Sequence, residues 1–380
     1  MKHFLRYCAI FAIPIIIFLT TLEIIVGNIP NSYSYKYNYV IKHGDEIQAL
    51  AVGHSELYDG FMPESFYLPS FNLSNAAQDF IDNYYLLCEL LPYMPNLKLV
   101  IMPVGYSNVK VINNKKKMIL SDRSCYYHKY MNLDYDGHVP LRYLFECFDP
   151  HKASDKVYSY YIKHKDIVRC DSMGRRSTHY LQDRKHELGY NKIIEGYTQK
   201  ECDYHKLCID KEDFLLKTLE MLCEKNISIV MVSPPYYWDC AFKNINEQQR
   251  CFVKRYMDDL CSRYPILYFD HQSDSTFTYD DFYDETHLSE IGAKKFTEML
   301  NRDIKQSIIS SPQTVEPSRR AVERKQIMGS FFILIIVCIL LINTFLWGEA
   351  STTPLQQTSA TCYINNVSYP WRPPHASHEP

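Results

Sequence analysis

The chain contains a series of short, continuous runs of apolar residues. The runs of strand length occupy residues 47–53, 97–103, 227–232 and 266–270, and residues 70–73 are a weaker strand candidate. Strands that are apolar throughout are typical of parallel sheets, because such sheets are buried on both faces. The pattern therefore predicts a central parallel sheet.

Segments with apolar residues at helical spacing separate these runs. They cover residues 79–93, 214–225 and 247–264. Ser289 is suited to the N-cap of a final helix. The side chains expected on the inner face of that helix are Ile291, Phe296, Met299 and Leu300. Strands alternating with helices predict an α/β fold with helices on both faces of the sheet.

The stretch from about 105 to 210 interrupts this alternation. It is rich in Tyr, His and Lys and lacks clean periodicity. It is too long for a plain loop, so we expect a helical insertion that caps the site. The domain itself is expected over 47–305, between linkers at 27–46 and 306–330.

The N-terminal segment has the length and composition of a membrane span. Residues 7–26 are apolar except for Glu23, and about 20 residues of helix cross a bilayer. A cleaved signal peptide is the alternative, but the run is long for one and no A-x-A-like site follows. We therefore expect an anchor over 1–26. Lys2 and Arg6 place its N-terminus in the cytoplasm by the positive-inside rule.

A second apolar run covers residues 331–347 and follows a basic stretch at 319–325. If both runs span, the charge rule gives opposite orientations for them. Following the first run puts the main domain on the extracytoplasmic side of the cell membrane. The tail, 348–380, is rich in Pro, Ser and Thr, which predicts disorder.

Composition excludes some classes of function. The 44 acidic and 41 basic residues give a net charge of −3. No basic field exists to hold nucleic acid, and no nucleic-acid motif is present. The 13 cysteines are an odd number. Those of the main body could form a disulfide framework outside the cytoplasm, with a connectivity that the sequence does not reveal. Cys202, His205 and Cys208 have ligand-like spacing but lack a fourth ligand, so we expect no metal.

Two polar clusters follow the pattern expected of an active site. Residues 53–60 come directly after the first strand, and residues 284–292 precede the last helix. Active sites of open parallel sheets lie beyond the carboxyl ends of the strands. A serine hydroxyl needs a neighbouring imidazole as base, which a carboxylate orients. Ser55, His287 and Asp284 supply these three groups.

The two clusters resemble known sequence blocks. G-x-S-x-x-x-x-G at 53–60 and D-x-x-H-L-S-x-x-G at 284–292 look like the first and last blocks of the SGNH (GDSL-type) hydrolase superfamily, in the style of its membrane-anchored bacterial branch. The resemblance implies a three-layer, SGNH/flavodoxin-like sandwich. It also implies Ser55 as nucleophile, His287 as base and Asp284 as its partner.

The middle blocks depart from the family pattern. The second block, 71–78, has no glycine, and the third has Gly105 three residues before Asn108 rather than two. The resemblance assigns the oxyanion hole to Ser55, Ala77 and Asn108, with Asn75, Ala76 and Ser107 as alternatives.

The resemblance implies a membrane-anchored serine esterase or O-acyltransferase that needs no cofactor. Its expected substrate is an acylated envelope glycan or another small ester, with O-acetyl groups the first choice. Two alternatives stay open. One is an inactive glycan-binding or assembly protein of the same fold, and the other is an esterase acting on lipids.

Overall fold

A computed structural model describes residues 2–105, 108–111, 123–139, 145–184, 188, 207–237 and 247–310. The chain divides into two units, Met1–Pro312 and Gln313–Pro380, and all of the described residues belong to the first. The predicted second span (331–347), the tail (348–380) and most of the linker at 306–330 lie outside the described residues.

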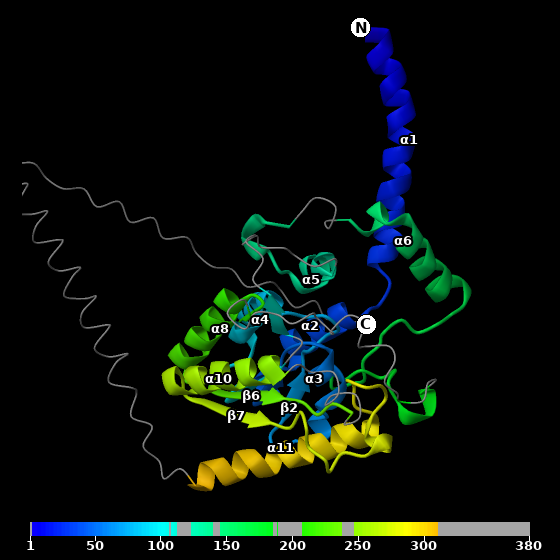
Figure 1. Ribbon diagram of the computed structural model, residues 1–380. Helices are drawn as coiled ribbons and strands as arrows, with labels where there is room; N and C mark the ends of the chain where they lie inside the picture. Colours follow the sequence, from blue (N-terminus) through cyan, green and yellow to red (C-terminus); the bar gives the residue numbers. More distant parts are fainter. Residues whose placement is uncertain are drawn as a thin grey trace, which may run out of the picture. The chain divides into compact units, whose positions relative to one another are not determined.

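The core of the fold is a five-stranded parallel sheet (Figure 1). Its strands are β1 (Ala49–Ala51), β2 (Ser70–Asn72), β3 (Leu99–Pro103), β6 (Ser228–Ser233) and β7 (Ile266–Asp270). They lie in the order β2-β1-β3-β6-β7. The predicted α/β fold with a central parallel sheet is confirmed. The strand order reverses beside β1, which is the position where open α/β sheets bind ligands.

Helices cover both faces of the sheet, and α4, α8 and α10 begin and end near the predicted positions. The helices next to the sheet are α2 (Ser32–His43), α3 (Ser55–Gly60), α4 (Phe80–Leu90), α8 (Glu212–Glu224), α10 (Glu247–Arg263) and α11 (Glu290–Ser310). The others are α1 (Lys2–Gly27), α5 (Ser124–Met131), α6 (Pro150–Val157) and the π-helix η8 (Tyr158–Ile162). Short 3₁₀ helices lie at Gly44–Glu46, Pro63–Ser65, Leu91–Tyr93, Tyr135–Gly137, Glu146–Phe148, Leu181–Asp183 and Tyr279–Asp281.

Successive residues of each strand enter opposite hydrophobic cores. Leu50 and its neighbours on one face pack with α2, α4, α8 and α10. Ala49, Ala51 and the same face of β3 and β6 pack with α3 and α11. Because side chains alternate across a strand, the continuous apolar runs serve both cores. The result is three layers, with α11 on the side of the sheet opposite α4, α8 and α10 (Figure 1).

The segment predicted as a linker, 27–46, instead forms α2. The side chain of Asn31 caps this helix by accepting hydrogen bonds from the N–H groups of Tyr33 and Ser34. Val40 and Lys36 are fully buried. Tyrosines alternating with polar residues hid the helical periodicity of this segment.

The final helix follows the prediction except at one residue. Ser289 Oγ accepts a hydrogen bond from the Gly292 N–H, so it caps α11. Phe296 and Leu300 are fully buried, and Met299 packs against the same core. Ile291 is 49% exposed, so its predicted inward position was wrong. Its neighbour Gly292 is the residue that faces the protein at this turn.

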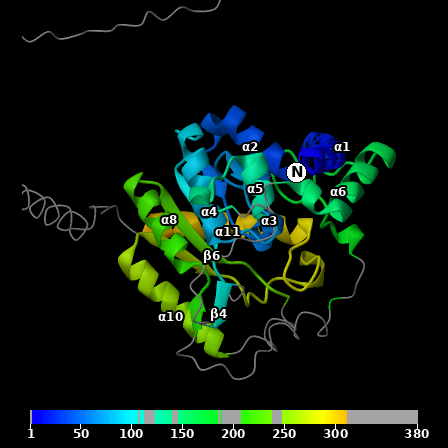
Figure 2. The ribbon, with the colours of Figure 1, turned by 90° about the horizontal axis from the view of Figure 1, so that it is seen from above.

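The insertion starts and ends at a short antiparallel ribbon. β4 (Val109–Val111) pairs with β5 (Leu207–Ile209), close to the predicted boundaries of 105 and 210. Between them lie α5, α6 and η8. The view from above shows α5 and α6 on the side of the sheet where α1 and α2 lie (Figure 2).

α1 is the helix that fits a membrane span by length and composition among the described residues. Its apolar window runs from Ile10 to Gly27, and little of it is buried by the protein. This is compatible with the predicted membrane anchor. Eight cysteines of the described part are free: Cys88, Cys125, Cys147, Cys170, Cys208, Cys223, Cys251 and Cys261. Cys202 and His205 lie outside the described residues.

Candidate active site

Ser55 stands where the chain leaves β1 and enters α3. It is the first residue of α3, and His54 is the N-cap. The turn before it passes very close to the end of β3. A Cβ on Gly53 would lie 2.2 Å from Cδ of Pro103, so only glycine fits there. Ser55 therefore lies at the carboxyl edge of the sheet, beside the reversal in strand order.

The loop before α11 holds Asp284 and His287 in one compact turn. Oδ1 of Asp284 accepts hydrogen bonds of 2.9 Å from the backbone N–H groups of Thr286 and His287. The same carboxylate lies 2.8 Å from Nδ1 of His287. The three-residue spacing thus brings the carboxylate onto the imidazole, as the sequence predicted.

The fold brings this imidazole to Ser55 across 232 residues of sequence. Nε2 of His287 lies 2.7 Å from Oγ of Ser55. With Nδ1 facing Asp284, the tautomer that fits carries its proton on Nδ1 and leaves Nε2 free to accept the serine proton. Ser55, His287 and Asp284 form a continuous hydrogen-bonded chain.

The glycine that ends the second motif lets α11 approach this loop. A Cβ on Gly292 would lie 1.9 Å from the carbonyl oxygen of Asp281. That oxygen accepts a hydrogen bond from the Ser289 N–H, and Ser289 Oγ donates to the Asp280 carbonyl. The motif D-x-x-H-L-S-x-x-G is therefore a packing unit that fixes the loop carrying His287.

The surroundings shift the pKa values of both titratable groups. Burial opposes the charged imidazolium, but the hydrogen bond to Asp284 and the negative charges of Asp59 and Asp284 outweigh it and raise the pKa of His287. Burial alone would raise the pKa of Asp284, but the hydrogen bond to His287 and the charge of that imidazole lower it by more. The pKa of Asp284 falls to about 2. The carboxylate is ionised at neutral pH, as an orienting partner requires.

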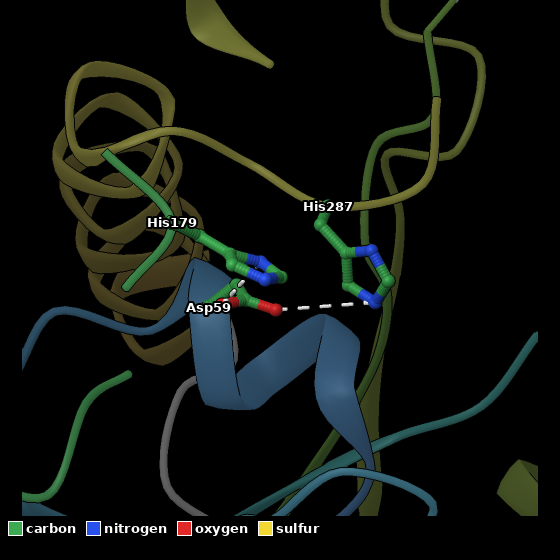
Figure 3. Close-up of side chains that lie close together, drawn as sticks. All are labelled: Asp59, His179 and His287. Atoms are coloured by element: carbon green, nitrogen blue, oxygen red, sulfur yellow. Dashed lines mark ion pairs between the residues drawn. The ribbon is translucent and has the colours of Figure 1, made fainter. Parts of the chain in front are cut away.

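A buried carboxylate that the sequence analysis missed lies beside the imidazole. Asp59 is fully buried on α3, one turn after Ser55. Its Oδ2 is 3.9 Å from Nε2 of His287. Ion pairs of 3.2 Å join its Oδ1 to Nε of Arg176 and to Nδ1 of His179, and Figure 3 shows its carboxylate between the two histidines. The sequence offered one signal for Asp59: it follows Ser55 by four residues, a spacing that places both residues on the same side of a helix.

Arg176 and His179 belong to the insertion. The His179 ring stacks on Tyr283 at 4.0 Å and meets the His287 ring edge-on at 5.6 Å. The insertion therefore contributes side chains to the site, and its role as a cap stays a prediction. No periodicity in residues 105–210 pointed to these two residues.

Asp59, His179 and His287 are also residue types that bind metal ions. One ligand atom from each lies within 4.8 Å of the others. Arg176, however, supplies the positive charge beside this carboxylate, and its Nη1 is 2.9 Å from Nε2 of His179. His287 already shares Nε2 with Ser55. The contacts of these residues favour acid–base chemistry over cation binding.

The predicted oxyanion donors differ in how well the structure fits them. The first N–H groups of a helix have no partner within it, which suits the N–H of Ser55. Oδ1 of Asn108 accepts a 3.0 Å hydrogen bond from the Gly105 N–H, leaving Nδ2 as its donor. Ala77 is exposed, in a left-handed conformation at φ 54°. The Asn75 N–H donates to the Gly53 carbonyl, so it is already used.

In the described part of the chain, no hydrogen bond joins Ala77 or Asn108 to Ser55. Their place in an oxyanion hole stays a prediction, and Ser107 lies outside the described residues.

The comparisons with known proteins do not assign the chain to a family. No protein-family model matches the chain, and no curated protein is significantly similar to it.

Proposed function

We propose that this protein is a serine esterase or O-acyltransferase of the SGNH type. The observation that supports this most is the chain of short contacts from Ser55 Oγ to His287 Nε2 and from His287 Nδ1 to Asp284. A serine, an imidazole and an ionised carboxylate in this order are the groups that acyl transfer through a serine requires.

In the proposed reaction, His287 Nε2 takes the proton of Ser55 while Oγ attacks the ester carbonyl. The N–H of Ser55, with Asn108 Nδ2 and the N–H of Ala77 as further donors, stabilises the oxyanion. The C–O bond to the alcohol then breaks, and the alcohol leaves with the proton from His287. This step leaves an acyl group on Ser55.

The second half of the reaction removes the acyl group. Water or a sugar hydroxyl gives its proton to His287 and attacks the acyl carbon, and Ser55 leaves as the hydroxyl after regaining that proton. Asp284 stays ionised and stabilises the imidazolium in both halves. No cofactor takes part in the proposed steps.

We propose an extracytoplasmic location, with α1 as the anchor in the cell membrane. The substrate class proposed is an acyl ester of an envelope glycan, with O-acetyl groups the first choice. The alternative is an inactive glycan-binding protein of the same fold. The departures in the second and third blocks favour it, because losing one oxyanion donor costs about 10²–10³-fold in rate.

Turnover of p-nitrophenyl acetate by the full chain in detergent distinguishes the two proposals. Wild type and the exposed-serine control Ser262→Ala should release nitrophenol at equal rates, and Ser55→Ala should not exceed the rate in buffer. Equal rates of nitrophenol release by wild type and both variants would favour the non-catalytic protein. A wild-type rate no higher than that in buffer would favour it as well.

A further inference from the structure

The last turns of α1 are built into the domain. Oε1 of Glu23 lies 2.5 Å from Nζ of Lys129 on α5, and Oε2 accepts a 3.0 Å hydrogen bond from the Cys147 N–H. Val26 is fully buried. Residues before Glu23, such as Phe11 and Phe18, are exposed and apolar. A membrane crossed by α1 would therefore end close to the domain surface around Cys147.

Besides α5, the 3₁₀ helix Glu146–Phe148 and α6 contact α1. Lys129 also pairs with Glu146 at 3.3 Å, and Lys156 of α6 pairs with the same carboxylate at 2.5 Å. These largely buried ion pairs connect α6 to the base of α1. Both ribbon views show α6 beginning beside α1 (Figures 1 and 2).

The helix that continues α6 carries an exposed patch of apolar and basic side chains. Tyr158 is 51% exposed, Tyr161 44% and Ile162 64%, and the exposed Lys163 and Lys165 follow. These five residues are called the tyrosine patch here. The backbone of Tyr158–Ile162 is a π-helix, a form that occurs mostly as a single turn continuing an α-helix and is frequent at functional sites.

The composition of the tyrosine patch matches the headgroup region of a bilayer. Tyrosine is enriched there because its ring is apolar and its hydroxyl polar. Lysine extends its charged end toward lipid phosphates while its methylenes contact apolar groups. Nζ of Lys163 lies 4.8 Å from the Tyr158 ring centroid, so the lysine and tyrosine side chains form one continuous surface.

We propose that the tyrosine patch binds the phospholipid headgroup region of the same membrane that α1 crosses. This inference rests on the proposed anchoring by α1 but not on esterase activity. Lipid is favoured as the occupant because the helix that carries the patch begins beside the anchor, although Figure 1 shows it running from there away from the N-terminal end of α1. The contact requires α1 to tilt toward the patch, and membrane helices tilt by about 20° on average. Two attachments fix the orientation of the domain relative to the bilayer, which one helix alone does not.

Photocrosslinking of the full chain in vesicles tests the proposal. p-Benzoylphenylalanine replaces Tyr161 in protein reconstituted with radiolabelled phosphatidylglycerol and phosphatidylethanolamine. The matched control is Tyr67, which is 37% exposed. It contacts Asn301 and Lys305 of α11, at the end of the domain far from α1 (Figure 1). Phe11 of α1, 74% exposed, is the positive control.

We expect lipid adducts at positions 11 and 161, with the yield at 161 several-fold above that at 67. Lipid adducts at position 11 with only background yield at position 161 would overturn the proposal that the tyrosine patch binds lipid, while the anchoring by α1 would stand. A protein adduct in place of a lipid adduct at 161 would also overturn it. Background yield at 11 would refute the anchoring on which the inference rests. None of these outcomes depends on Ser55, so a failed esterase assay leaves the result intact.

Discussion

Asp59 and Ser55 face the same nitrogen of His287. Oδ2 of Asp59 lies 3.9 Å from Nε2, and Oγ of Ser55 lies 2.7 Å from it. His287 therefore has a carboxylate near each ring nitrogen, with Asp284 at Nδ1. The charge of Asp59 helps to raise the pKa of the imidazole even though Arg176 pairs with the same carboxylate.

Removing the charge of Asp59 should move the pH dependence of the reaction. The base is active when neutral, so activity appears as pH rises through the pKa of His287. Asp59→Asn lowers that pKa, and the acidic limb of the rate profile should move to lower pH. The measurement is the second-order rate of fluorophosphonate labelling between pH 5 and 9.

The control for this profile is Asp155→Asn, because Asp155 is an exposed carboxylate on α6. Its profile should match that of wild type. A limb that stays in place or moves to higher pH in Asp59→Asn would exclude the electrostatic role. A titration of the His287 ring by NMR tests the same pKa shift without requiring activity.

Asn108 should act through its amide N–H₂ group. Asn108→Asp keeps Oδ1 as acceptor for the Gly105 N–H, while it removes the donor that an oxyanion needs. Labelling should slow by about 10²–10³-fold, with little change in melting temperature. The reverse result, a normal rate, would place the oxyanion donor elsewhere. Asn108→Ala removes both functions and should also lower the melting temperature.

Gly292 should be required for the loop that carries the imidazole. Gly292→Ala would force a Cβ to within 1.9 Å of the Asp281 carbonyl, so the loop or α11 must move. Overpacking of this kind costs about 1–3 kcal/mol. We expect a lower melting temperature and slower labelling of Ser55.

The control for Gly292 is Gly27→Ala. There the added Cβ meets only the flexible end of the Lys129 side chain, at 3.3 Å. This variant should melt and label like wild type. If Gly292→Ala does the same, the close approach of α11 does not position the loop.

The strands could be predicted because buried parallel strands are apolar on both faces. β3 and β7, for example, lie within apolar runs of the sequence. α2 was missed because its tyrosines alternate with Ser, Lys and Asn, which hides the one buried face that contains Val40. Ile291 was misplaced because helical spacing does not show that Gly292 makes the close contact.

The site could be predicted in part. Ser55, Asp284 and His287 stand in short motifs next to predicted elements, and topology brings strand ends together. Arg176 reaches Asp59 from an insertion that lacks periodicity, so local pattern could not place it. The pairing of Asp59 with a group more than a hundred residues away depends on tertiary packing alone.

Labelling of the full chain with a fluorophosphonate, followed by mass spectrometry of the adduct, asks whether the contact between Ser55 and His287 produces a nucleophile. Wild type should carry one phosphonyl group on Ser55, and Ser55→Ala and His287→Ala should stay unlabelled at the same concentration and time. An adduct on another residue, or equal labelling of all three proteins, would contradict the assignment of Ser55 and His287 as nucleophile and base.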